Sequence, residues 1–264
     1  MEKKWLFDGQ STRDFTAVRK DFVAEFLAKV QPQPDKGSAL DVGCGLGDFS
    51  KFLSDLGFRV VAVDGREENS AEARKRYADI VFRTQNAEEL SVAELGTFDL
   101  VLCFGLLYHL ENPFRTIRQL FALTKNILFV ESMCASGSRP NMELIDESHD
   151  ENQALTYVAF YPSEPCLIKM LYRAGFPYVY AFEKLPPHPL FHASFWRRKA
   201  RTMLVASKVP LAASGLQLTA DVRGSWEVLS SNRERLKARI GGLVGSILKP
   251  FRQGSLRPED GRKR

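Results

Sequence analysis

A glycine-rich turn constrains this 264-residue sequence more than any other feature. The apolar run 38–42 leads into the turn, and an amphipathic helix pattern leaves it at Asp48. Glycines at Gly43, Gly45 and Gly47 permit backbone conformations that other residues avoid, and they let a ligand approach the main chain. The pattern therefore predicts a strand, a tight loop and a helix, which is how a nucleotide-binding α/β unit begins.

The spacing of these glycines distinguishes between ligands. A dinucleotide-binding loop reads G-x-G-x-x-G, which would place its third glycine where this sequence has Asp48. Asp41 stands shortly before the first glycine. A carboxylate beside the loop would repel a pyrophosphate, whereas it would attract a cationic amino group. The spacing therefore argues against a nicotinamide-dependent oxidoreductase.

Short apolar runs alternate with helix patterns along the chain. We expect strands at 38–42, 58–63, 80–82, 97–103, 126–130, 178–182 and 201–207. A loop joins the last two strands, so the last one must pair antiparallel, because a parallel return needs a longer crossover. The expected fold is α/β: a doubly wound, mostly parallel seven-stranded sheet with helices on both faces and an antiparallel last strand.

The pattern D-x-G-x-G-x-G, from Asp41 to Gly47, resembles motif I of the class I methyltransferases that use S-adenosylmethionine (SAM). The resemblance covers about 36–207 and includes several segments in the same order. It implies a Rossmann-like fold and SAM as cofactor, with the loop around the methionine part and the acid near its ammonium group. The implied cofactor-binding residues are Asp41, Gly43, Cys44, Gly45, Gly47, Asp64, Gly65, Asn86, Ala87 and Phe104.

Asp64 follows the second expected strand, immediately before Gly65. In doubly wound folds an acid at this position accepts hydrogen bonds from the ribose hydroxyls, and the resemblance implies the same role. An isolated Asp here would otherwise be interpreted as a solvated turn carboxylate. With the glycine motif in place, we expect the ribose role.

Two further positions have alternative interpretations. The resemblance implies that Asn86 contacts the adenine amino group, with the N–H of Ala87 nearby. Asn86 also suits the N-cap of a helix that starts near Glu88, and both roles can hold together. Phe104 follows the fourth expected strand, where it either borders the cofactor or belongs to the core.

His109 is the first candidate for a catalytic base. It follows the fourth expected strand, and histidine titrates near neutral pH. In related sequences the pair Tyr108-His109 often serves packing or substrate placement, so that role stays open as well. Glu131 and His149 are weaker candidates, since each also suits a solvated or helix-capping residue. The sequence has no acidic cluster of the kind that binds magnesium, and no metal is expected.

The chain divides into three expected parts. Residues 1–35 form an N-terminal segment with an amphipathic helix over 16–30, and 36–207 form the SAM-binding domain. Within that domain, 132–160 is polar and without clear period, which indicates a lid or substrate-binding insertion. Residues 208–264 form a linker and a basic amphipathic tail.

The tail contains ten basic and three acidic residues from Arg233 onward. Its apolar residues follow helical spacing over 233–252, so it needs a surface on which to fold. That surface is the domain itself, a second subunit or an anionic membrane. Nucleic acid ranks lower, because the rest of the chain is not basic. The oligomeric state stays open.

Other features indicate a cytoplasmic location, peripheral at a membrane if the tail binds one. The four cysteines form no C-x-x-C pair, and the N-terminus lacks the apolar stretch of a signal peptide. No apolar run approaches the length of a membrane span.

The leading hypothesis is SAM-dependent transfer of a methyl group to an O or N of a small molecule. Residues 186–196 and 132–160 would form the acceptor pocket, and a lipid-linked or glycan acceptor stays open. One alternative is a tRNA base methyl or carboxymethyl transferase, because 107–109, 161–163 and 174–176 resemble the wobble-uridine branch of this superfamily. Another is a non-catalytic scaffold with the SAM fold.

Overall fold

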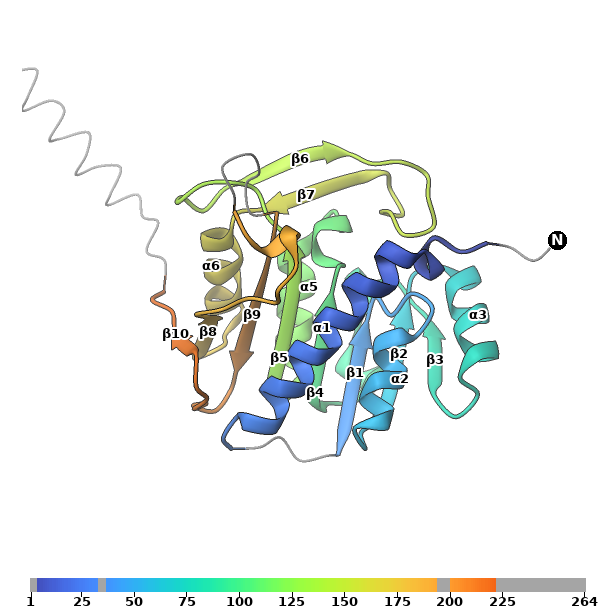
Figure 1. The fold of residues 1–264 in the computed structure, drawn as a ribbon, viewed down its shortest axis with the longest axis horizontal. Coiled ribbons are helices and arrows are strands. Elements are labelled where there is room, and N and C mark those ends of the chain that lie inside the picture. The colour runs from blue at the N-terminus through green and yellow to red at the C-terminus, as the bar shows by residue number, and fades with distance from the viewer. Residues whose placement is uncertain (1–3, 33–36, 194–199, 222–264) are drawn as a thin grey trace, which may run out of the picture. The chain divides into compact units, whose positions relative to one another are not determined.

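The computed structural model describes residues 4–32, 37–193 and 200–221. The tail predicted over 233–252 lies outside these ranges. The described residues form an eight-stranded sheet and a two-stranded hairpin (Figure 1). The strands of the sheet are β1 (Ser38–Val42), β2 (Arg59–Asp64), β3 (Val81–Thr84), β4 (Phe98–Phe104), β5 (Thr124–Met133), β8 (Tyr178–Phe182), β9 (Arg201–Ser207) and β10 (Leu216–Leu218). The hairpin consists of β6 (Met142–Asp146) and β7 (Val158–Pro162).

The strand order in the sheet is β10-β8-β9-β5-β4-β1-β2-β3. Neighbouring strands from β5 to β3 are parallel, and β9 lies antiparallel between β5 and β8. This confirms the predicted fold class. The structure adds β10, which pairs antiparallel with β8 inside the range that was expected to be a linker. A mostly exposed strand of three residues is too short to produce a recognisable pattern in the sequence.

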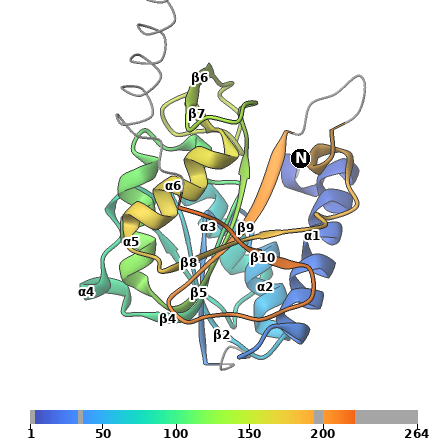
Figure 2. The ribbon, with the colours of Figure 1, turned by 90° about the vertical axis from the view of Figure 1, so that its left-hand side faces the viewer.

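Helices cover both faces of the sheet (Figure 2). They are α1 (Gln10–Lys29), α2 (Asp48–Asp55), α3 (Glu67–Arg76), α4 (Val92–Leu95), α5 (Pro113–Leu123) and α6 (Glu164–Ala174), with short 3-10 turns η1 (Leu6–Asp8), η2 (Ala87–Glu89), η3 (Leu107–His109) and η4 (Pro189–Phe191). One core packs α1 and α2 on the sheet through Phe26 and Phe49. The other packs α5 and α6 on the opposite face through Ile117 and Leu171. Two apolar faces on every central strand explain the nearly continuous apolar runs in the sequence.

The N-terminal helix predicted over 16–30 is present, and it begins earlier, at Gln10. Its buried residues include Val23 and Phe26, as expected for the apolar face of an amphipathic helix. Within the described ranges, no helix combines the length and the apolar character that a bilayer crossing requires.

The hairpin β6–β7 lies largely within 132–160, where the sequence shows no clear period, and its second strand ends at Pro162. It runs across the carboxyl ends of the central strands (Figure 1). Four of the five residues of β6 are exposed, so the strand carries no alternation of buried and exposed residues that could have predicted it. The loop 147–157 that joins the two strands is called the insertion loop below.

Candidate active site

A cavity of about 340 Å³ lies at the carboxyl edge of the parallel strands. Its wall combines the loops after β1, β2, β3 and β4 with side chains of α1, the insertion loop and the start of β9. The predicted cofactor-binding residues that the wall brings together are Gly43, Cys44, Gly45, Asp64, Gly65, Asn86, Ala87 and Phe104. Ligands of open α/β sheets bind at this edge.

The glycine loop adopts the conformation that its sequence requires. Gly45 has a φ of +54°, and Gly47, with a φ of +89°, is the N-cap of α2 in the left-handed region. A Cβ on Gly45 would come within 2.9 Å of the ring of Phe7. Only glycine therefore allows both the turn and the close approach of the N-terminal segment.

Asp64 connects the loop to β2 through hydrogen bonds. Its carboxylate accepts from the backbone N–H of Gly45 at 2.9 Å and of Arg66 at 2.9 Å, and from the side chain of Asn69 at 3.1 Å. Burial raises the pKa of Asp64, and these donors oppose the rise. The interpretation as a solvated turn carboxylate is therefore wrong, because Asp64 is half-buried in the cavity wall and accepts from three N–H groups.

Asn69 also lines the cavity beside Asp64. Its Oδ1 is buried and has no hydrogen-bond partner among the described residues. Buried polar atoms are normally paired, so an acceptor in this position indicates a missing donor. An oxygen-rich ligand with hydroxyl donors, such as a ribose, fits this part of the wall.

Asp41 lies outside the cavity wall, as does Gly47. The carboxylate of Asp41 is buried beneath the loop and accepts a hydrogen bond from the hydroxyl of Ser50 at 2.6 Å. Burial raises the pKa of Asp41 to about 7, and the Ser50 bond opposes this rise. The structure thus places Asp41 where it supports the loop from below, without direct access to a ligand in the cavity.

Asn86 and Phe104 each have both of the roles that the sequence left open: a structural role and a place in the cavity wall. The side chain of Asn86 accepts from the N–H of Glu88 at 3.0 Å, which makes it the N-cap of η2, and the residue also lines the cavity. Phe104 packs edge-on against Phe49 and Phe129 while it borders the cavity.

His109 lines the cavity and is paired with Glu147 of the insertion loop. The distance between His109 Nδ1 and Glu147 Oε2 is 2.6 Å, and the side chains are 10% and 5% exposed. Burial lowers the pKa of His109, and Glu147 opposes this only in part. A carboxylate can only accept, so Nδ1 carries the hydrogen and Nε2 is left as an acceptor. This pair has the geometry of a base held by a carboxylate.

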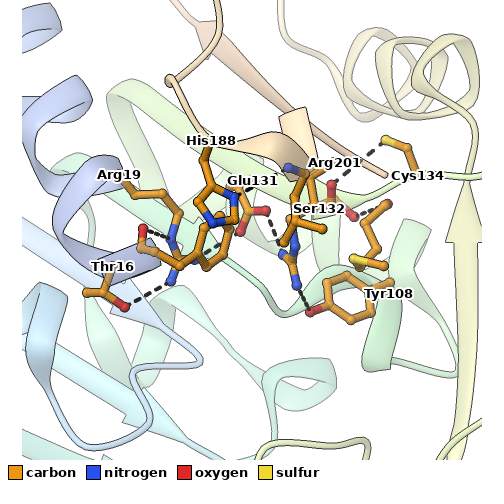
Figure 3. A network of polar contacts seen from close by, with 11 residues as sticks. Thr16, Arg19, Tyr108, Glu131, Ser132, Cys134, His188 and Arg201 are labelled. Carbon is orange, nitrogen blue, oxygen red and sulfur yellow. Dashed lines mark hydrogen bonds and ion pairs between the residues drawn. The ribbon is translucent and has the colours of Figure 1, made fainter. Parts of the chain in front are cut away.

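Glu131 lies between two arginines that line the cavity, Arg19 and Arg201 (Figure 3). Its carboxylate is fully buried and pairs with Arg19 of α1 at 3.2 Å and with Arg201 of β9 at 2.6 Å. The interpretation of Glu131 as a solvated or helix-capping residue is therefore wrong. Arg201 also donates to the hydroxyl of Tyr108 at 2.9 Å.

The two arginines respond differently to burial. Burial lowers the pKa of Arg19, and Glu131 opposes this only in part. Burial acts in the same direction on Arg201, but Glu131 and Tyr108 outweigh it and raise the pKa of Arg201. Both guanidinium groups keep their charge at neutral pH, because arginine titrates far above that range.

The insertion loop is attached over the side of the cavity where Asp64 lies. Arg66 Nη2 donates to the carbonyls of Asp150, Gln153 and Ala154 at 3.2–3.4 Å. Leu155 lies so close to Gly65 that a Cβ on the glycine would come within 2.8 Å of its side chain. These contacts close the cavity on the side where Asp64 lies.

A comparison with protein families gives the identity of the fold. The model of a family described as "Methyltransferase domain" matches residues 13–181. The chain belongs to this family. The predicted resemblance to class I SAM-dependent methyltransferases is confirmed.

Relatives of this methyltransferase domain include proteins named ubiquinone biosynthesis O-methyltransferase. The one from Xanthomonas axonopodis pv. citri (strain 306) is 33% identical over 127 residues, which are 46% of this chain and 51% of the relative. The one from Caulobacter vibrioides is 35% identical over 100 residues, which are 36% and 40% of the two chains. The chain therefore spans about half the length, or less, of these relatives.

Solved structures resemble the methyltransferase domain over most of its length. The N-terminal domain of EvdMO1 with SAH bound has a TM-score of 0.57 and 19% identity, and the match covers 73% of this chain and 80% of the EvdMO1 chain. Magnesium protoporphyrin IX methyltransferase from Synechocystis PCC 6803, with bound SAM, has a TM-score of 0.52 and 20% identity, with 79% and 87% covered. At these identities the likeness shows the fold alone.

Some residues of the methyltransferase domain's site differ from the sequence-based candidates. His149 is exposed, lies with its ring 3.7 Å from that of Tyr157, and does not line the cavity. Sequence reasoning missed Arg19, Arg201 and Glu147. Nothing in the local sequence marked them, because their partners lie far away along the chain.

Proposed function

We propose that this protein transfers a methyl group from SAM to an oxygen or nitrogen of a small-molecule acceptor. The observation that carries the proposal is a single cavity with two chemically different sides. One side presents the glycine loop and Asp64, and the other presents His109, which the buried Glu147 holds from behind the wall. The names of the relatives favour an oxygen acceptor.

The loops after β1, β2 and β3 follow one another along the cavity wall, in an order that matches the parts of SAM. The loop after β1 would hold the methionine part, Asp64 after β2 would accept from the ribose hydroxyls, and Asn86 with Ala87 after β3 would border the adenine. The unpaired Oδ1 of Asn69 supports a hydroxyl-bearing group beside Asp64. Asp41 would act through the loop, since it has no place in the wall.

SAM, when bound, supplies a methyl group that its sulfonium already makes electrophilic. The protein's part is to align an acceptor with that methyl group and to keep water away, and alignment alone can be worth effective molarities on the order of 10⁵–10⁸ M. The insertion loop, attached through Arg66, excludes water on the cofactor side.

His109 would accept the proton of an acceptor hydroxyl at Nε2. Its lowered pKa keeps the imidazole neutral at neutral pH, so that the base is ready before the acceptor binds. Glu147 would hold the ring in place and stabilise the charge that forms on it. Glu147 in turn accepts from the N–H of Ala154 at 2.8 Å, which couples the base to the closed insertion loop.

Other hypotheses stay predictions. No contact among the described residues favours a tRNA substrate or a non-catalytic scaffold over a small-molecule methyltransferase. The cytoplasmic location and the membrane contact through 233–252 concern features outside the described structure.

The test is calorimetric titration with SAM and S-adenosylhomocysteine (SAH), followed by an acceptor screen with methyl-labelled SAM. We expect both ligands to bind the wild type, and label to reach at least one small acceptor. In the His109→Ala variant we expect binding of SAH to be retained and transfer to fall. Absence of SAM and SAH binding by folded protein would overturn the proposal.

A further inference from the structure

We propose that the acceptor carries an anionic group, with a carboxylate as the best fit, and that this group binds on the side of the cavity formed by Arg19 and Arg201. This inference rests on the proposed function, because it concerns the second substrate of the same cavity. It predicts acidic small molecules as the substrate class.

The first observation is an excess of positive charge at a buried position. Among the described residues, Arg19 and Arg201 share one carboxylate, that of Glu131, and both arginines line the cavity. Their side chains are only 10% and 14% exposed. A buried charge without a counter-charge is unfavourable, so this cluster favours a ligand that brings a negative charge.

The second observation concerns the donors of Arg201. A guanidinium group has five N–H donors. Among the described residues, Arg201 uses one nitrogen for Glu131 and another for Tyr108, and its buried Nε has no partner. Unpaired buried donors are rare in native proteins, and planar carboxylates match the fork of a guanidinium group.

The other charged groups of the wall are paired within the chain. Asp64 accepts from three N–H groups, Asp48 pairs with Lys20 at 3.6 Å, and Glu151 accepts from the backbone N–H of Leu6. Arg66 is bound to three carbonyls of the insertion loop. Among the described residues, the excess of positive charge is therefore confined to the cluster of Arg19 and Arg201 around Glu131.

The position of Arg201 assigns this charge to the acceptor. The proposed cofactor residues follow β1, β2 and β3, whereas Arg201 begins β9. β9 is separated from β1 by β4 and β5, and adjacent strands lie about 4.8 Å apart, so the two strands are about 14 Å apart. The side chain of Arg201 contacts Tyr108, next to the candidate base His109. An anion held there would lie near His109 and away from the loops after β2 and β3 that are proposed to hold the ribose and the adenine.

Charge complementarity agrees with this assignment. SAM carries a net positive charge, and its side of the cavity contains Asp64, with Asp41 below the loop. Arg201 lies away from these residues, at the start of β9, and Arg19 of α1 lies between the two regions, with its guanidinium carbon 5.1 Å from the centre of the Phe49 ring. An acidic acceptor would therefore be attracted to its own side and to the sulfonium, while a cationic acceptor would be repelled.

The experiment uses the full chain saturated with SAH. Its probes are a panel of aryl and alkyl carboxylic acids, each paired with the neutral amide of the same shape, and ligand-observed NMR measures their binding. We expect at least one acid to bind more tightly than its amide by about 10-fold or more, as for charge-assisted hydrogen bonds. We expect Arg201→Met to remove this preference and Arg201→Lys, which keeps the charge, to restore part of it.

Lys208→Met is the matched control, because it removes a positive charge beyond the other end of β9 and outside the cavity wall. Calorimetry with SAH tests whether each variant is folded and binds cofactor. If Arg201→Met fails to fold, the comparison of Arg201→Lys with the wild type tests the inference. Lysine lacks the planar fork of the guanidinium group, so Arg201→Lys should still bind the acid more weakly than the wild type.

Three results would overturn the inference. The first is that the SAH complex binds acids and amides equally well, or binds none of them. The second is that both Arg201 variants keep the same preference for acids as the wild type. The third is that the Arg201 variants bind SAH more weakly but acids as before, which would assign the charge to the cofactor's own carboxylate. In each of these cases the wild type still binds SAH. Loss of SAH binding by the wild type would instead be a failure of the proposed function itself.

Discussion

Asp64→Asn is the sharpest test of the cofactor side of the cavity. The substitution keeps the size of the side chain and removes its charge. In the wild type one carboxylate accepts from the N–H of Gly45, the N–H of Arg66 and the amide of Asn69 at 2.9, 2.9 and 3.1 Å. An asparagine has one acceptor oxygen, and its NH₂ group must face a donor at the other position.

The expected loss follows from the number of bonds that change. Hydrogen bonds to charged groups contribute about 1.5–3 kcal/mol each, and neutral ones about 0.5–1.5 kcal/mol. If Asp64 accepts from the ribose as proposed, the variant weakens such bonds by about 2–3 kcal/mol in total, which is about 30- to 150-fold in Kd. SAM and SAH should be affected alike, because they share the ribose.

Calorimetric titration measures the two dissociation constants, and Asp99→Asn is the control. Asp99 accepts from the N–H and the hydroxyl of Ser38, each at 2.8 Å, near the start of β4 and outside the cavity wall. Both variants should lower the free energy of unfolding, which urea titration measures. Only Asp64→Asn should weaken the binding of SAM and SAH. Equal SAH affinity in Asp64→Asn and the wild type would refute the role assigned to Asp64.

Three further predictions test other contacts. Glu147→Gln removes the group that raises the pKa of His109, so the acidic limb of the pH profile of kcat/KM should move to lower pH; a move to higher pH would contradict the pairing. Burial raises the pKa of Asp41 to about 7, whereas in the unfolded chain this carboxyl loses its proton near the ordinary pKa of an aspartate. Between these two pKa values only the folded state binds the proton, so the free energy of unfolding should fall as pH rises from 4 to 7. In Asp41→Asn the fall in Tm over this window should be smaller than in the wild type, and equal falls would count against the buried carboxyl. Arg66→Ala removes three hydrogen bonds to the insertion loop, so amide hydrogen exchange there should lose about 1–3 kcal/mol of protection, while exchange in β5 stays unchanged; unchanged exchange in the loop would show that other contacts hold it.

Local patterns were sufficient to predict the central sheet. The apolar runs that became β1, β2 and β4 are continuous because both faces of these strands are buried by helices. The glycine turn was equally readable, since its backbone conformations are open mainly to glycine. The positions of Asp64 and His109 at the carboxyl edge followed from the alternation of strands and helices.

The exposed elements left no such pattern. β6 has little burial on either side, and β10 has only three residues, so neither produced a period in the sequence. Asp41 shows a different limit. Its position before the glycine loop was clear, but only the packing of Ser50 and the loop above it decided that its carboxylate lies outside the cavity wall.

The sequence by itself determined the fold class and the residues of the glycine loop, because strand burial and backbone freedom are properties of neighbouring residues. Only the tertiary structure decided which charges meet. Arg19 and Glu131 are 112 positions apart, Glu131 and Arg201 are 70 apart, and His109 and Glu147 are 38 apart. Each pair is created by the crossing of α1, by the antiparallel insertion of β9, or by the fold of the insertion loop over η3. Charge interactions depend on distance in space, and no local pattern records that distance.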